Sequence, residues 1–221
     1  MRNVCIILLF LISLKVSAQT SVELYFYDAC KDSVLSLEFE LYSYREEWGD
    51  LKSEGSKLMV QEKGEYFVSS SIVRGEWYSV FSIPIDISDS PILDTLEIPN
   101  IGMATTRALH SSAFTYLNCS EIANGYEEDY RKDGSLRMIG EFSDGLPLLI
   151  SEYNLSGVLN QKRFYSENGS DFNRVEYYDD NGELWFYEIH KNRKRKTIIR
   201  TYDEMGKLED REVIKHTIVK F

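Results

Sequence analysis

Apolar and polar residues alternate along short stretches of the first half of the chain, which is the pattern of strands that bury one face. In the first stretch, Val22, Leu24 and Phe26 share one side and alternate with polar and tyrosine side chains. Similar stretches follow as far as Ile98, separated by glycine, aspartate and serine residues typical of turns. This pattern predicts an antiparallel β-sandwich over residues 19–100.

The second half carries an internal repeat of the form Tyr, three residues, Gly, one residue, Leu. Successive tyrosines of the repeat are 23, 25 and 24 residues apart. Such a constant period is the signature of a repeat architecture, so residues 126–215 are predicted to hold four units of about 24 residues. The matching positions are Tyr130, Gly134 and Leu136; Tyr153, Gly157 and Leu159; Tyr178, Gly182 and Leu184; and Tyr202, Gly206 and Leu208.

The residue types of the repeat explain what each unit forms. Dipeptides such as Asp133-Gly134 and Asn181-Gly182 supply the positive φ angles that tight hairpin turns require. Each unit is therefore expected to be two strands and two turns. Because a lone hairpin cannot bury its apolar face, the units are expected to stack. The predicted fold class is all-β, a sandwich followed by a β-hairpin repeat sheet.

The aromatic residues of the repeat allow two interpretations. The four repeat tyrosines would form either an aromatic platform for sugars or peptides, or a ladder that fixes the register between units. The ladder is favoured because the tyrosine marks the same turn in every unit. Tyr177, Trp185 and Tyr187 break the pattern, and we expect them to be the better candidates for a recognition surface, with a glycan as one ligand.

On these residues, the stretch of about 126–210 resembles the MORN-repeat-variant family of bacterial hairpin-repeat proteins. The resemblance implies a MORN-like hairpin sheet, and some members of that family are labelled antitoxin components of toxin–antitoxin systems. Only the tyrosine, glycine and leucine recur here, whereas the MORN repeat proper adds further glycines and a tryptophan. The resemblance assigns no functional residue to this chain.

Two segments of the first half begin with glycine, glutamate and an aromatic residue, namely Gly64-Glu65-Tyr66 and Gly75-Glu76-Trp77. They resemble the transthyretin-like, carboxypeptidase-regulatory sandwich, which implies a non-catalytic adaptor in an exported protein. Residues 101–125 show no clear periodicity and are predicted to be a linker between the two domains.

The first 18 residues have the three parts of a secretory signal peptide. Arg2 precedes the apolar run Val4–Leu14, and Val16-Ser17-Ala18 supplies small residues for cleavage. The apolar run is shorter than the roughly 20 residues that a membrane-spanning helix needs. The chain is thus predicted to be exported, to the periplasm or the cell exterior, with no integral membrane span.

Cys5 lies within this signal, which leaves Cys30 and Cys119 in the mature chain. An even pair in an oxidising compartment favours a disulfide between them. The alternative is two buried thiols. Their spacing fits neither a zinc site nor a redox motif.

Charge and motifs exclude several function classes. The chain carries 25 basic and 36 acidic residues, a net charge of −11, which disfavours nucleic acid as a partner. The three histidines are scattered, and phosphate loops, dinucleotide fingerprints and nucleophile elbows are lacking. We therefore expect no catalytic residue, no metal and no cofactor. The basic run of residues 190–196 predicts an exposed hairpin turn, with an anion-binding or acidic-lipid patch as the alternative.

These observations predict an exported, non-catalytic protein-binding or scaffolding module that uses an extended hairpin-repeat surface. The alternative is an antitoxin-like or immunity-like protein that neutralises a partner toxin. An acidic chain would meet a basic toxin by charge complementarity.

Overall fold

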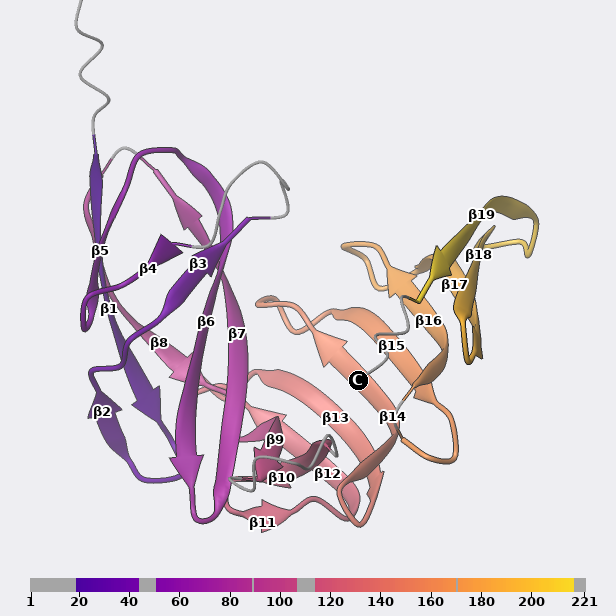
Figure 1. The fold of residues 1–221 in the computed structure, drawn as a ribbon, viewed down its shortest axis with the longest axis horizontal. Helices are drawn as coiled ribbons and strands as arrows, with labels where there is room; N and C mark the ends of the chain where they lie inside the picture. Colours follow the sequence, from indigo (N-terminus) through magenta and orange to yellow (C-terminus); the bar gives the residue numbers. More distant parts are fainter. Residues whose placement is uncertain (1–18, 44–50, 89, 107–113, 170, 217–221) are drawn as a thin grey trace, which may run out of the picture.

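The computed structural model describes residues 19–43, 51–88, 90–106, 114–169 and 171–216, and the predicted signal peptide lies outside them. The described residues form strands, turns and loops, with no helix among them. The strands make three sheets, none of them closed into a barrel, so the all-β prediction is confirmed (Figure 1).

The sandwich is built from the first two sheets. The four-stranded sheet contains β1 (Thr20–Asp28), β2 (Ser33–Leu35), β5 (Lys57–Val60) and β8 (Ile92–Ile98). The seven-stranded sheet contains β3 (Glu40–Tyr42), β4 (Leu51–Lys52), β6 (Gly64–Arg74), β7 (Trp77–Ile87), β9 (Ile101–Thr106), β10 (Phe114–Asn118) and β11 (Glu121–Ile122).

Side chains from both sheets meet in one core. β1 alternates between buried and half-buried residues along its whole length, as its sequence pattern predicts. Its Phe26 packs edge-on against Phe39 and Phe81 at ring-centroid distances of 6.2 and 5.5 Å. Apolar residues of β3, β5, β6 and β8 complete this core, which makes the sandwich a folding unit with its own hydrophobic centre.

Two details of the sandwich differ from the sequence prediction. β8 pairs with β1 in parallel, from Val22 opposite Ile92 to Asp28 opposite Ile98, because the chain crosses from one sheet to the other after β7. Residues 101–125 are predicted as a linker, but their described parts contain β9, β10 and β11, which extend the seven-stranded sheet. The linker prediction is wrong because buried Ile101, Ala104 and Leu117 sit on strands too short to show a clear period.

The sandwich is fastened at one end by a disulfide and a buried ion pair. Cys30 and Cys119 are bonded at a sequence separation of 89, which confirms the predicted disulfide. Beside this disulfide the fully buried guanidinium of Arg74 donates to Asp28 Oδ1 at 3.3 Å and to the carbonyls of Pro99, Asn100 and Cys119. Burial lowers the pKa of Arg74 and the Asp28 charge opposes that shift, so the guanidinium remains charged.

The third sheet holds the repeats and consists of eight antiparallel strands in sequence order. They are β12 (Gly125–Tyr130), β13 (Leu136–Ser143), β14 (Leu146–Tyr153), β15 (Leu159–Tyr165), β16 (Phe172–Tyr178), β17 (Leu184–Arg193), β18 (Lys196–Asp203) and β19 (Leu208–Lys215).

Every repeat makes the same turn. The signature tyrosine pairs with the signature leucine, as Tyr130 does with Leu136, and the strand register shifts next to each tyrosine. The amide of each signature glycine donates to the carbonyl three residues earlier. All four glycines have φ between +75° and +83°, which is costly for any residue with a Cβ. The repeat is therefore a bulged hairpin whose glycine is required by the backbone.

An asparagine or aspartate after the tyrosine secures three of the four turns. Oδ1 of Asn154, Asp179 and Asp203 accepts backbone N–H groups two and four residues further on. The first repeat has Arg131 at this position, and its guanidinium donates to the carbonyls of Leu136 and Tyr153.

The repeat sheet packs against the sandwich side through strands near its beginning, β13, β14 and β15. Met138, Phe142 and Ile150 form a second core with Ile101 and Ala123 of the sandwich side. Figure 1 shows the sheet beginning beside the lower end of the sandwich and curving away, so that β16–β19 stand clear of it.

Polar contacts secure the same boundary. The buried carboxylate of Asp129 binds Arg137 at 3.0 Å, and Arg137 also reaches Glu97 of β8 at 3.1 Å. Burial raises the pKa of Asp129, while Arg137 and the backbone N–H groups of Asn100 and Ile101 oppose that shift. These contacts couple the first repeat to the sandwich.

Candidate interaction surface on the outer repeats

The pairing register of β15–β19 sorts their charged side chains by face, because paired residues point to the same side of a sheet. One side, here called the basic face, collects the cations of five strands. It contains Lys162, Arg174, Lys191, Arg193, Lys196, Arg200, Arg211 and Lys215. The opposite side, here called the acidic face, holds carboxylates of β17–β19: Glu188, Asp203, Asp210 and Glu212.

The cations of the basic face are poorly neutralised. Along the paired positions of the described β16–β19, Glu176 is the one carboxylate on this face, and it bonds Arg174 at 2.7 Å. Meanwhile Arg200 lies directly opposite Arg211, and Lys196 lies opposite both Arg193 and Lys215. Like charges directly opposite each other destabilise a sheet. The like-charge pairs of the basic face therefore lower the stability of the sheet, which a surface of mixed charges would not do.

Aromatic rings border the cations at one end of the basic face. Tyr187 and Tyr202 stack with ring centroids 5.1 Å apart and an interplanar angle of 11°. The guanidinium carbon of Arg174 lies 4.2 Å from the Tyr187 ring centroid, a cation–π arrangement. Tyr178 donates to Glu176 at 2.6 Å, and burial followed by this hydrogen bond raises its pKa. The tyrosines and Arg174 thus form a fixed aromatic border.

The acidic face carries different aromatic contacts. Tyr177 stacks on Phe186 with centroids 4.4 Å apart. His190 contacts Glu188 at 2.8 Å and packs edge-on against Phe172. These interactions occupy His190, and the described residues bring no three His, Cys, Asp or Glu side chains together as a metal site. His110 lies outside the described residues.

The four signature tyrosines occupy equivalent positions in their repeats. Tyr130, Tyr153, Tyr178 and Tyr202 lie on β12, β14, β16 and β18, so an intervening strand separates each from the next. This is the spacing expected for repeats of two strands each, and the role of the tyrosines in fixing the register between units stays a prediction. Each tyrosine pairs across its own turn, and Tyr130 and Tyr178 each donate to the glutamate two residues before it.

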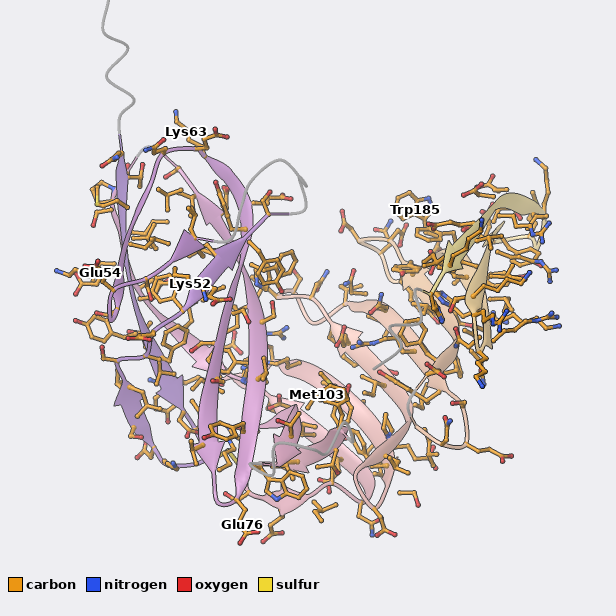
Figure 2. The ribbon with its side chains drawn as sticks, in the orientation of Figure 1. Lys52, Glu54, Lys63, Glu76, Met103 and Trp185 are labelled. Atoms are coloured by element: carbon orange, nitrogen blue, oxygen red, sulfur yellow. A yellow bond between two sulfur atoms is a disulfide. The ribbon has the colours of Figure 1, made fainter. Side chains whose placement is uncertain are left out.

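The three predicted recognition residues do not share one surface. Tyr177 is paired with Phe186 and Tyr187 with Glu176, so the two tyrosines point to opposite faces. Trp185 occupies the extra position of the bulge between them and is 64% exposed, in the outer part of the sheet (Figure 2). A joint surface of Tyr177 and Tyr187 is therefore wrong, because Phe186, the partner of Tyr177, is the neighbour of Tyr187 and neighbouring residues of a strand face opposite ways.

The open edge of the sheet is β19. All eight of its residues are exposed, including Leu208, Val213 and Ile214, and β18 is its one partner strand among the described residues. An exposed edge strand presents unpaired backbone N–H and C=O groups to other chains. The basic face thus ends at a strand able to accept another.

A pocket of about 250 Å³ lies between the sandwich and the first repeats. Its walls include Val80, Met103, Tyr116 and the ion pair of Glu152 with Arg163, and Figure 2 labels Met103 between the two domains. Because the two charged groups neutralise each other, we regard the basic face as the stronger candidate site.

Comparison with known proteins adds no assignment, since no family model and no curated protein matches this chain. None of the described segments is a helix that could cross a membrane. The intramolecular disulfide is typical of proteins in an oxidising, exported environment.

Proposed function

We propose that this chain is an exported, non-catalytic binding module that presents its outer repeats, β16–β19, to a protein partner. The observation that carries the proposal is the segregation of charge on these strands. Cations from several strands share one face and oppose each other directly, although the paired carboxylates of β17–β19 lie on the other face. A partner that supplies negative charge would relieve this repulsion.

The rest of the molecule fits a supporting role. The sandwich has its own core, a disulfide and a buried ion pair, and it holds the first repeats through Asp129 and Arg137. Such a rigid base would fix the orientation of the outer repeats. Extended repeat surfaces of this kind commonly serve as docking sites.

Site-specific photo-crosslinking tests the proposal. A photoreactive amino acid would replace Trp185 or Ile214 on the outer repeats and, as the control, Leu93 on the sandwich, which is 73% exposed. Incubation with the exported fraction of the native organism should give one protein crosslinked from both repeat positions and absent from the Leu93 sample. Excess unlabelled protein should compete for that crosslink.

Crosslinks that are absent, or equally strong from Leu93, would rule out the outer repeats as the docking site. If the captured protein were a toxin that loses activity on binding, the module would be a neutralising protein, the alternative raised by the sequence.

A further inference from the structure

We propose that β19 accepts an extended polypeptide strand with an acidic side, which pairs as a ninth strand of the repeat sheet and continues the basic face. This inference rests on the proposed function and specifies the chemistry of the partner. It combines two observations, the open edge and the charge sorting, which reside on the same eight residues.

The first observation is the length and regularity of the edge. β19 pairs continuously with β18 from Thr201 opposite Asp210 to Lys196 opposite Lys215. The register shift lies at the turn end, beside Tyr202 and Leu208, so the remaining residues form a regular strand without proline. In an antiparallel strand, alternate residues direct N–H and C=O away from the existing partner. A peptide can bond to these groups by strand addition.

The second observation is the charge pattern that an added strand would meet. Arg211, Val213 and Lys215 lie on the basic face, whereas Asp210, Glu212 and Ile214 lie on the acidic face. A complementary strand has carboxylates opposite Arg211 and Lys215 and an apolar residue opposite Val213. Basic residues opposite Asp210 and Glu212 complete the charge complementarity of this strand. Charged residues on edge strands normally discourage pairing, so this pattern selects one class of partner.

A polypeptide fits better than another polyanion, because only a polypeptide uses the edge and the face together. A glycan or a lipid surface would contact the basic side chains but leave the backbone groups of β19 unpaired. A peptide strand satisfies those groups and also places carboxylates beside Arg211, the neighbour of Arg200.

A second copy of the chain is a poor occupant of the same edge. Two β19 strands related by a two-fold axis would continue the same face from one copy to the other. If the two-fold axis passes at residue 211, Arg211 of one copy lies opposite Arg211 of the other. If it passes at residue 212, Glu212 lies opposite Glu212 of the other copy. If the axis passes at residue 213, Arg211 lies opposite Lys215 of the other copy. Each of these three registers therefore places like charges opposite each other, which destabilises the pairing.

Peptide binding to the whole mature protein tests this inference. The matched probe has the central residues glutamate, isoleucine, valine, lysine, glutamate and lysine, which pair antiparallel from Lys215 to Asp210. The control probe exchanges every glutamate and lysine, so its composition is the same and its charges change sides. Fluorescence anisotropy should show the matched probe binding at least about tenfold more tightly, with the difference reduced at high salt.

Variants of the protein provide the reciprocal test. The double substitution Arg211→Glu with Lys215→Glu should abolish the preference, because each probe then forms two opposite-charge and two like-charge pairs with β19. Lys191→Glu, on the same face but two strands from the edge, should leave the preference for the matched probe. Thermal unfolding of each variant checks that the sheet remains intact, as expected for exposed positions.

N-methylated probes separate strand pairing from simple charge attraction. Methyl groups on the amides of one set of alternate residues should abolish binding, and methyl groups on the other set should preserve it. Equal loss or no loss for both sets would overturn the inference. Equal affinity for the matched and control probes would overturn it as well.

The outcomes also distinguish this inference from the proposed function. If neither peptide binds while the crosslinks from Trp185 and Ile214 persist, the edge is wrong and the binding module stands. If polyglutamate, a sulfated polysaccharide or anionic vesicles bound the double variant as well as the unsubstituted protein, strand addition at β19 would also be contradicted. If the crosslinks fail too, both proposals are wrong.

Discussion

The inner repeats, β12–β15, and the outer repeats, β16–β19, share one sequence signature but have different surroundings. Both have the tyrosine–leucine pair, the register shift and the glycine turn. The inner strands bury Met138, Phe142 and Ile150 against the sandwich side, whereas every residue of β19 is exposed. The signature therefore specifies the hairpin, and the residues between signatures decide whether it serves as core or as surface.

This difference indicates where stability and binding reside. The inner repeats bury apolar side chains against the sandwich. Among the described residues of β16–β19, only Val175 and Ile198 are buried apolar side chains, so the outer repeats depend more on their turns and neighbouring strands. Local stability in proteins falls where buried apolar contacts are few. We expect the free energy of local unfolding to decrease along the sheet from β13 to β19. Exposed charged side chains are most numerous at the β19 end of the sheet.

The largest expected effect comes from the same type of substitution, isoleucine to alanine, made in each of the two regions. Ile150→Ala removes a fully buried side chain from the inner repeats and should lower the unfolding free energy by about 2–5 kcal/mol. Ile214→Ala, at 43% exposure on β19, should lower it by less than about 0.5 kcal/mol. Denaturant unfolding of the two variants measures the contrast, and equal losses would contradict the division into core and surface repeats.

Turn glycines should give an intermediate effect that is alike in both regions. A Cβ at Gly134 or Gly206 meets no atom closer than 3.5 Å, so alanine there costs only backbone conformation. With φ near +80°, each substitution should cost about 1–2 kcal/mol. Hydrogen exchange at the two turns measures it.

The two glycine variants should differ in how far the damage spreads. Gly206→Ala should loosen only β18 and β19, whereas Gly134→Ala should also lower global stability, since β13 belongs to the second core. A global loss from Gly206→Ala would show that the outer repeats are as strongly coupled as the inner ones.

The smallest effect is a gain in stability at the basic face. Arg211→Glu replaces the like-charge pair with Arg200 by an opposite-charge pair, which should stabilise the fold by about 0.2–1 kcal/mol. Arg174→Glu is the control, because it breaks the pair with Glu176 and should destabilise the outer repeats. Thermal unfolding at low salt measures both effects, and high salt should diminish them.

Local signals made much of the fold predictable. The buried alternation of Val22, Leu24 and Phe26 and the disulfide of Cys30 with Cys119 were predictable from pattern and residue count. The turns were predictable because Asp-Gly and Asn-Gly pairs act within a few residues. The parallel pairing of β8 with β1 could not be predicted, because the residues of neither strand indicate which distant strand it pairs with.

The candidate site was harder to predict because it depends on register between strands. The sequence shows a basic run of residues 190–196, but alternate members of that run point to different faces. Arg200, Arg211 and Lys215 join the basic face only through pairing. The available signal was the alternation of charge sign along residues 210–212, which a search for charge runs overlooks.

The disulfide has a mechanical consequence for a module anchored at its ends. Tension between the N-terminal strand and the outer repeats would enter at β1, cross from Cys30 to Cys119, and continue into β12. The 88 residues between the cysteines lie outside this covalent path and share its load only through non-covalent contacts. Under a pull, the hairpin repeats would peel from β19 inward one after another, and the disulfide would limit how far the sandwich can extend.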